Sequence, residues 1–244
     1  MLDKRTQSLK IATAETLATL QDMRRWGVEH IYENSPSAQE LLPPCAELES
    51  SNSTAAPCRV ETLEEIRAEM GDCQRCLLSS TRNNLVFGAG NPKAALVFVG
   101  EGPSRREDEQ GEPFVGEAGQ LFNNILFAMG LTRDAVYICN VIKCRGPHNR
   151  DPGVDEIAAC APFLKRQLNA INPQVLVALG TLAAQSLLQD KTPISKLRGG
   201  WCSYNGIDLM PTFHPAYLLR NPEFKRELWQ DMKQVLQRLH SKDM

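Results

Sequence analysis

Four cysteines have the spacing of a metal site. Cys73 and Cys76 form a Cys-x2-Cys pair, Cys144 follows a predicted strand, and Cys160 lies in a predicted helix after fifteen intervening residues. Thiolates close in sequence can hold one metal centre, and distant ones complete it on folding. A zinc ribbon would favour a second close pair, whereas this arrangement suits an iron–sulfur cubane at least as well. The spacing alone leaves three alternatives open: an iron–sulfur cluster, a zinc ion, or buried cysteines without a metal.

A second set of chemically capable residues follows the predicted strands. Phe114 lies in a glycine-rich loop, where it is either a core plug or a platform that stacks on a nucleobase. Asn140 ends a strand, and its amide offers a donor and an acceptor that match a pyrimidine edge. His214 precedes a proline after the last strand and is either structural or catalytic. The functional alternative for all three is a site that holds a planar base.

Alternating strands and helices must position these residues. Apolar runs predict strands over 94–99, 136–141 and 175–179, with a weaker one over 207–213. Helical stretches alternate with them over 61–70, 117–129, 154–170, 181–188 and 222–240. The order predicts an α/β fold with a central parallel four-stranded sheet flanked by helices on both faces. Ligands bind beyond the carboxyl ends of such strands, which is where the candidate residues fall.

The first 60 residues have a different character from the rest. Apolar residues near helical spacing predict a helix over 13–32 within an N-terminal helical extension, 1–33. Residues 34–60 are rich in Ser, Pro, Ala and Glu, which predicts a flexible linker. The helix packs either on the body or on a partner. One domain is predicted over 61–244.

Composition limits the class of protein. The chain has 244 residues, 42% of them hydrophobic, which suits a folded core. No apolar run approaches the ~20 residues of a membrane span and no signal peptide is visible, so we expect a cytoplasmic, nucleoid-associated protein in a reducing compartment. The first 60 residues carry six basic and eight acidic groups, and the remainder carries 21 of each. This balance excludes a coat of positive charge but not a local basic groove.

Several motifs in order resemble the family 4 uracil-DNA glycosylases. They are Gly-Glu-Gly-Pro from residue 100, Pro-Phe-Val-Gly from 113, Asn140 with Lys-Cys-Arg at 143–145, Asn-Arg at 149–150, and His-Pro-Ala-Tyr-Leu-Leu-Arg from 214. The similarity covers about residues 61–240 and includes the cysteine spacing. It implies a monomer that hydrolyses the N-glycosidic bond of deoxyuridine in single- or double-stranded DNA and leaves an abasic site. It also implies a [4Fe–4S] cluster.

The resemblance implies roles for the residues that would touch the base. Phe114 stacks on the extrahelical uracil, and Asn140 hydrogen-bonds its edge. His214 faces uracil O2. Leu218 aligns with the residue that wedges into the duplex.

It also implies roles around the sugar and the cofactor. Glu101 and Gly102 lie in the loop whose polar groups handle water, and Glu107 organises the sugar side or the water. The [4Fe–4S] cluster would be held by Cys73, Cys76, Cys144 and Cys160.

One departure from the family pattern keeps an alternative open. Ser104 stands where family members usually have glycine, which puts the bend of the first loop in doubt. The alternative is a catalytically weak uracil- or DNA-binding iron–sulfur protein of the same superfamily. Two basic stretches are expected to contact phosphates without reading sequence; they comprise Lys143, Arg145 and Arg150, and Lys191, Lys196 and Arg198.

Overall fold

The computed structural model describes residues 16–28 and 60–242. Within the first range, residues 16–25 form a helix, in the middle of the predicted 13–32 segment. Nearly all of the predicted linker, and the start of the predicted extension, lie outside the described residues. The division into extension, linker and domain therefore stays a prediction.

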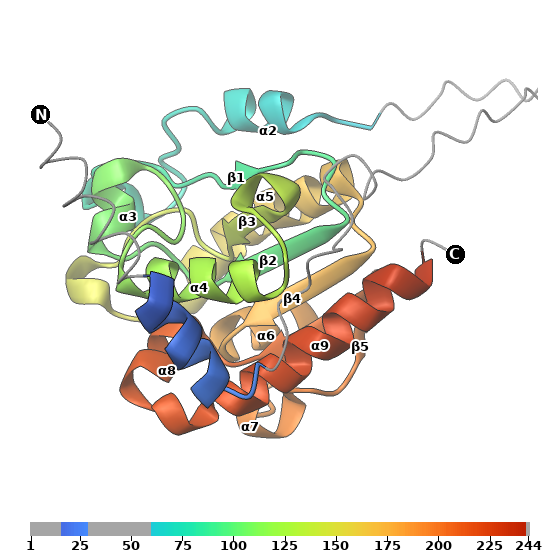
Figure 1. Cartoon of the computed structure of the whole chain (residues 1–244). Coiled ribbons are helices and arrows are strands. Elements are labelled where there is room, and N and C mark those ends of the chain that lie inside the picture. Colours follow the sequence, from blue (N-terminus) through green and yellow to red (C-terminus); the bar gives the residue numbers. More distant parts are fainter. Residues whose placement is uncertain (1–15, 29–59, 243–244) are drawn as a thin grey trace, which may run out of the picture.

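A six-stranded mixed sheet forms the centre of the protein, in the order β1-β3-β2-β4-β6-β5 (Figure 1). The four inner strands are mutually parallel, and the two short outer strands are antiparallel to their neighbours. Their bounds are β1 Ala89–Gly90, β2 Leu96–Gly100, β3 Tyr137–Asn140, β4 Val175–Leu179, β5 Cys202–Tyr204 and β6 Ile207–Thr212.

The predicted four-stranded, wholly parallel sheet is therefore corrected to a mixed sheet. The four apolar runs match the inner strands, since strands buried on both faces read as continuous apolar stretches. The outer strands have two and three residues, and none of these is fully buried. Such short segments carry no apolar run, so the periodicity could not reveal them.

Helices cover both faces of the sheet. The longer ones are α2 Leu63–Met70, α4 Glu117–Ala128, α5 Val154–Ile171, α6 Thr181–Leu188 and α9 Lys225–Lys242. The shorter ones are α3 Arg105–Gln110, α7 Ile194–Leu197 and α8 Pro215–Arg220, with 3₁₀ turns at η1 Leu77–Ser80, η2 Arg133–Ala135, η3 Pro147–Asn149 and η4 Pro222–Phe224. None of the described helices is long and apolar enough to cross a membrane.

Alternate residues of the inner strands enter two hydrophobic cores. Phe98 and Val177 belong to the core under α4, α8 and α9, whereas Val99 and Ala178 belong to the core under α2, α5 and α6. The parallel strands end together at one edge of the sheet, where β2 and β3 pair up to Gly100 and Asn140. The loops that carry the candidate site therefore meet at this edge.

The helix over residues 16–25 (blue in Figure 1) packs on the body. Met23 and Trp26 are 2% and 7% exposed and belong to the core that contains α4, α8 and α9. The Lys225 ammonium of α9 lies 4.5 Å from the centre of the Trp26 ring. Of the two packing alternatives, the described residues show packing on the body.

Candidate active site and cysteine site

A hollow at the carboxyl ends of β2, β3 and β6 brings together the predicted base-binding residues. Phe114, Asn140 and His214 line it, as do Gly102 and Glu107. An adjoining hollow is lined by Glu101 and shares several residues with the first. The shared residues are Gly102, Ser104, Asn149, His214 and Ala216. The two hollows together form one groove, here called the strand-end groove.

Phe114 is held in a strained conformation at the floor of this groove. Its φ angle is 56°, in the left-handed region that non-glycine residues rarely adopt. The ring is 4% exposed, stacks beside His214 at 5.5 Å between centroids, and lies 4.9 Å from the Phe122 ring. Phe114 thus belongs to the core and to the groove at once. Strain of this kind, costing ~1–3 kcal/mol, clusters at functional sites.

Arg133 holds the strained loop in place, and sequence reasoning missed it. Its guanidinium donates to the Phe114 carbonyl at 3.2 Å and to the Pro113 carbonyl at 2.6 Å. A third hydrogen bond reaches the Asn123 side chain at 3.1 Å. Burial lowers the pKa of Arg133, and nearby acids only partly oppose this. Nothing in the local sequence marks Arg133, because it reaches the loop across about twenty residues of chain.

Asn140 presents an unpaired amide to the groove. It ends β3 and is 2% exposed, and its carbonyl accepts a 2.8 Å hydrogen bond from the Lys143 ammonium. No described residue hydrogen-bonds the side-chain amide. A side chain at position 100 would collide with this amide and crowd the Phe114 ring, which explains the glycine there. The amide is therefore available to a ligand.

His214 is oriented by the helix that it begins. It is the N-cap of α8, and its Nδ1 accepts a 3.0 Å hydrogen bond from the Ala216 N–H. Burial, with a contribution from the Arg220 charge, lowers the pKa of His214 from 6.5 to about 4. Because Nδ1 accepts, the neutral ring carries its proton on Nε2. His214 is thus a neutral N–H donor at physiological pH.

The depressed pKa of His214 gives a testable pH dependence. Between about pH 6.5 and 4 the unfolded chain binds a proton at this residue and the native protein does not. The unfolding free energy contributed by His214 should therefore fall as pH falls through that window. Urea unfolding of wild type and His214→Gln at pH 7.5 and pH 5 measures it: the wild type should lose more stability. NMR titration showing a His214 midpoint above pH 6 would contradict the assignment.

The two candidate glutamates occupy different parts of the groove. Glu107 is 6% exposed, lies in α3, and accepts a 2.6 Å hydrogen bond from the Ser104 N–H. Glu101 lines the adjoining hollow, where burial and the negative charge of Asp151 raise its pKa. A raised pKa makes a carboxylate a stronger base. Gly102 lies between the two glutamates in the sequence, and a Cβ at this position would clash with the Ile142 side chain.

Leu218 does not reach the groove, so its predicted role as the wedge is corrected. It is 1% exposed and packs in the core that contains Trp26 and Trp229. Leu219, the next residue of α8, is 42% exposed and lines the groove with Phe114. Successive residues of a helix differ by about 100° in direction, so only one of the two leucines can face the core.

The predicted basic rim is corrected at Lys143 and Arg198, whereas Arg150 lines the groove as predicted. Lys143 is 1% exposed and bonds the Asn140 carbonyl, so it cannot contact phosphate. Arg150 forms a two-pronged ion pair with Glu156, and Arg198 pairs with buried Asp231. The exposed arginines that line the groove are Arg150, as predicted, and also Arg105, Arg106 and Arg220.

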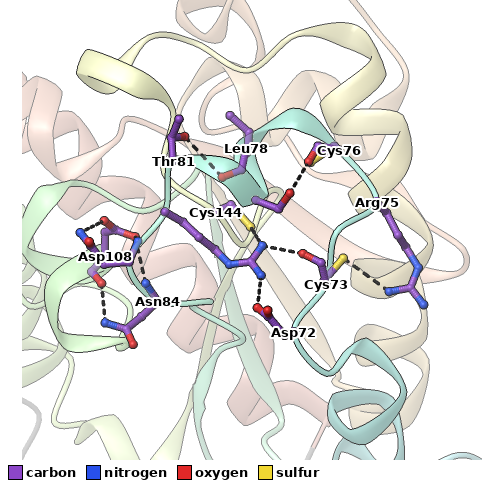
Figure 2. Close-up of polar contacts among 12 residues, drawn as sticks. Asp72, Cys73, Arg75, Cys76, Leu78, Thr81, Asn84, Asp108 and Cys144 are labelled. Carbon is purple, nitrogen blue, oxygen red and sulfur yellow. Dashed lines mark hydrogen bonds and ion pairs between the residues drawn. The ribbon is translucent and has the colours of Figure 1, made fainter.

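The four predicted metal-binding cysteines lie in one region. All four belong to or pack against the core under α2, α5 and α6. Burial raises the pKa of the Cys144 and Cys160 thiols, and neighbouring thiols of the set raise both values further. Cations surround them: Arg82 donates to the Cys144 sulfur at 3.2 Å, and Arg75 donates to the Cys73 sulfur at 3.4 Å (Figure 2). The positive charge and the main-chain N–H of Lys143 both lower the pKa of Cys160 and so oppose the effect of burial.

Among the described residues, no group of three or more histidine, cysteine or acidic side chains is arranged to hold a metal ion. This observation applies to a zinc ion and to an iron–sulfur cluster alike, so among the described residues it does not decide between them. Cys139, predicted to be a core residue, is fully buried within β3.

Comparison with known proteins places the chain in a family. A family model of the Uracil DNA glycosylase superfamily matches residues 87–233, which include the groove and its candidate residues. A type-4 uracil-DNA glycosylase from Thermotoga maritima is 44% identical over 181 residues, covering 72% of this chain and 94% of the relative. The type-4 enzyme from Archaeoglobus fulgidus is 42% identical over 184 residues, covering 72% and 92%. The chain therefore belongs to the uracil-DNA glycosylase superfamily and, within it, to the type-4 uracil-DNA glycosylases.

Proposed function

We propose that the chain hydrolyses the N-glycosidic bond of deoxyuridine in DNA within the strand-end groove, releasing uracil and leaving an abasic site. The observation that carries this proposal is the position of three groups around one hollow. An aromatic ring, an unpaired buried amide and a neutral imidazole N–H donor meet there. A pyrimidine base needs these contacts on its face, its edge and its O2 atom.

Recognition of the base follows from the chemistry of these groups. The Phe114 ring offers stacking worth ~1–3 kcal/mol per base. The Asn140 amide pairs with the neighbouring carbonyl and N–H of uracil, whereas cytosine reverses that donor–acceptor pattern. Leaving a buried amide unpaired costs ~1–3 kcal/mol, and uracil removes that cost. The groove is therefore matched to uracil more closely than to cytosine.

Cleavage of the bond builds negative charge on uracil and positive charge on the sugar. The neutral His214 Nε2–H faces the developing charge on O2, so its hydrogen bond is stronger in the transition state than in the ground state. Because the imidazole is neutral, it donates a hydrogen bond to O2 without transferring a proton to uracil before the glycosidic bond breaks. The Glu107 and Glu101 carboxylates stabilise the cationic sugar and orient the attacking water, as carboxylates do in glycoside hydrolysis.

Access to the base requires the nucleotide to leave the duplex, which costs a few kcal/mol. Leu219 is exposed at the groove and is suited to fill the space that the base vacates. Arg105, Arg106 and Arg220 are suited to hold the flanking phosphates without reading sequence.

The two neighbouring leucines should show opposite phenotypes when replaced. Leu219→Ala should slow cleavage of double-stranded uracil DNA about tenfold, within the few kcal/mol of flipping, and leave single-stranded cleavage nearly unchanged. Leu218→Ala should lower the unfolding free energy by ~2–5 kcal/mol, because it empties a core position. Single-turnover cleavage of both substrates, together with thermal unfolding, separates the two. If Leu218→Ala is stable and selectively slow on duplexes, the assignment is reversed.

A [4Fe–4S] cluster held by Cys73, Cys76, Cys144 and Cys160 forms part of the proposal. Its support is chemical: the four cysteines lie in or against one core, Arg75 and Arg82 donate to the Cys73 and Cys144 sulfurs, and the Lys143 charge lowers the pKa of Cys160. Four thiolates carry more negative charge than the metal core neutralises, which these cations would offset. When bound, the cluster would cross-link distant segments of the chain, and the hydrolysis itself transfers no electrons.

Loss of one cysteine tests the cofactor. Cys144→Ser should abolish the visible absorbance of the purified protein, reduce its iron from about four atoms per chain, and lower its melting temperature. Cys202→Ser is the matched control, because Cys202 lies in β5 outside the four-cysteine set. Stoichiometric zinc with no iron in the wild type would refute the cluster.

The experiment that tests the function is release of uracil from a defined oligonucleotide. Duplexes containing uracil, thymine or hypoxanthine opposite guanine are incubated with the protein, and abasic sites are then cleaved with alkali. Strand scission should depend on uracil. No scission by iron-loaded protein would refute the proposal and favour the catalytically weak alternative. That alternative rests on Ser104, whose N–H donates to the Glu107 carboxylate at the start of α3.

A further inference from the structure

Helix α3 carries Glu107 into the groove, yet it has no apolar anchor. Its sequence is Arg-Arg-Glu-Asp-Glu-Gln, and its buried residues are Glu107 and Asp108. Hydrophobic packing therefore cannot position this helix. The two buried carboxylates face different surroundings, since adjacent helical residues point about 100° apart. Glu107 faces the groove, and Asp108 faces the segment that follows the Cys-x2-Cys pair.

Asp108 is fully buried and bound by one short segment. Its carboxylate accepts hydrogen bonds from the Asn83 N–H at 2.8 Å, the Asn83 amide at 2.6 Å and the Asn84 N–H at 3.3 Å. The Asn84 amide donates back to the Asp108 carbonyl at 2.8 Å. No arginine or lysine among the described residues pairs with this carboxylate. Its burial therefore depends on the N–H groups of residues 83 and 84.

The same segment is fixed to the cysteine site at its other end. The Arg82 side chain is 5% exposed, and it donates to the Cys73 carbonyl at 2.7 Å and to the Cys144 sulfur at 3.2 Å. It also pairs with Asp72 at 2.5 Å. Figure 2 shows these contacts and those of Asp108 as two separate groups of polar interactions, and the main chain of residues 82–84 connects the two groups. Residues 82–84 thus join the cysteine region directly to α3.

We propose that Asp108 is a positioning residue for Glu107, and that residues 82–84 form a brace that transmits the position of the cysteine site to the groove. The inference rests on the proposed function of Glu107 in the groove. It assigns the cysteine region a structural effect on the active site that requires no electron transfer. A displacement on the order of 1 Å of a positioned group can cost ~10²-fold in rate, so a short brace can matter.

Amide hydrogen exchange tests the brace without reference to activity. The Ser104 N–H reports the position of Glu107, because it donates to that carboxylate at 2.6 Å. Asp108→Asn replaces an acceptor with a donor facing Asn83, so exchange at Ser104 should accelerate at least about tenfold, while amides in β4 exchange as in wild type. Arg82→Gln should accelerate it in the same direction. Unchanged exchange at Ser104 in both variants would overturn the proposal.

A double-mutant cycle tests whether Asp108 acts through Glu107. Asp108→Asn should slow single-turnover uracil release about tenfold, but less than about twofold in a Glu107→Gln background, since coupled residues are not additive. Additive effects would overturn the proposal. The matched control is Glu109→Gln, an exposed α3 residue that pairs with Arg105 and should leave the rate unchanged.

Two safeguards keep the test decisive. If Asp108→Asn fails to fold, Asn83→Ala replaces it, because this variant removes one amide donor and leaves the carboxylate with its backbone partners. If the wild type releases no uracil, the proposed function fails, and hydrogen exchange at Ser104 still tests the brace. An active wild type whose Asp108→Asn variant keeps full rate and normal exchange refutes the brace alone.

Discussion

Replacing His214 by alanine should slow uracil release by about 10²–10³-fold, the usual cost of removing one donor to a developing anion. The structure supplies the reason: Nδ1 is occupied by the Ala216 N–H, so Nε2–H is the proton that faces the groove. Affinity for uracil DNA should change far less than the rate, because the hydrogen bond strengthens mainly in the transition state. Single-turnover kinetics together with an equilibrium binding assay measures the two separately.

The cap of α8 must be separated from catalysis in this test. Removing an N-cap acceptor costs about 0.5–2 kcal/mol of stability, so His214→Ala should also lower the melting temperature. His214→Asn keeps a good capping side chain and should restore stability without restoring the rate. His240→Ala in α9 controls for loss of a histidine elsewhere. An active His214→Ala variant would show that another group stabilises the uracil anion.

Replacing Asn140 by alanine should have the second large effect, a loss of at least about 10²-fold in the cleavage of uracil DNA. Its amide is the buried group that reads the base edge. A site built to hydrogen-bond its substrate rejects an analogue that lacks the bonding group by ~10⁴-fold or more. Discrimination should fall together with rate, because stacking on Phe114 does not distinguish pyrimidines. Rates on uracil and cytosine substrates measured side by side give both quantities.

Stability is not expected to explain the Asn140→Ala result. No described residue hydrogen-bonds the amide, so the variant leaves no partner unsatisfied. Asn172→Gly is the matched control. Asn172 ends α5 with a left-handed backbone and lies near the amino-terminal ends of the parallel strands, away from the groove at their carboxyl ends. Full activity of Asn140→Ala on uracil, with intact discrimination against cytosine, would refute the proposed recognition of the base.

Much of the fold was readable from local patterns. The apolar runs identified the inner strands because a strand buried on both faces has no polar alternation, and Val175–Leu179 matches the predicted range. The edge strands β1 and β5 were not predicted, since segments of two or three residues carry no period. The strand order was likewise not readable, because β2 pairs with β3 and β4 through contacts distant in sequence.

Some features of the candidate site could likewise be predicted from the sequence, and others required the tertiary structure. The sequence by itself determined which residue types stand at the strand ends, and the parallel sheet brought Phe114, Asn140 and His214 to one groove. Only the tertiary structure decided that Leu219, and not Leu218, faces that groove. It also turned Lys143 inward and revealed Arg133 and Asp108 as supports. Residue type and strand position are local properties of the chain, whereas the direction and partners of a side chain depend on what packs against it from distant segments.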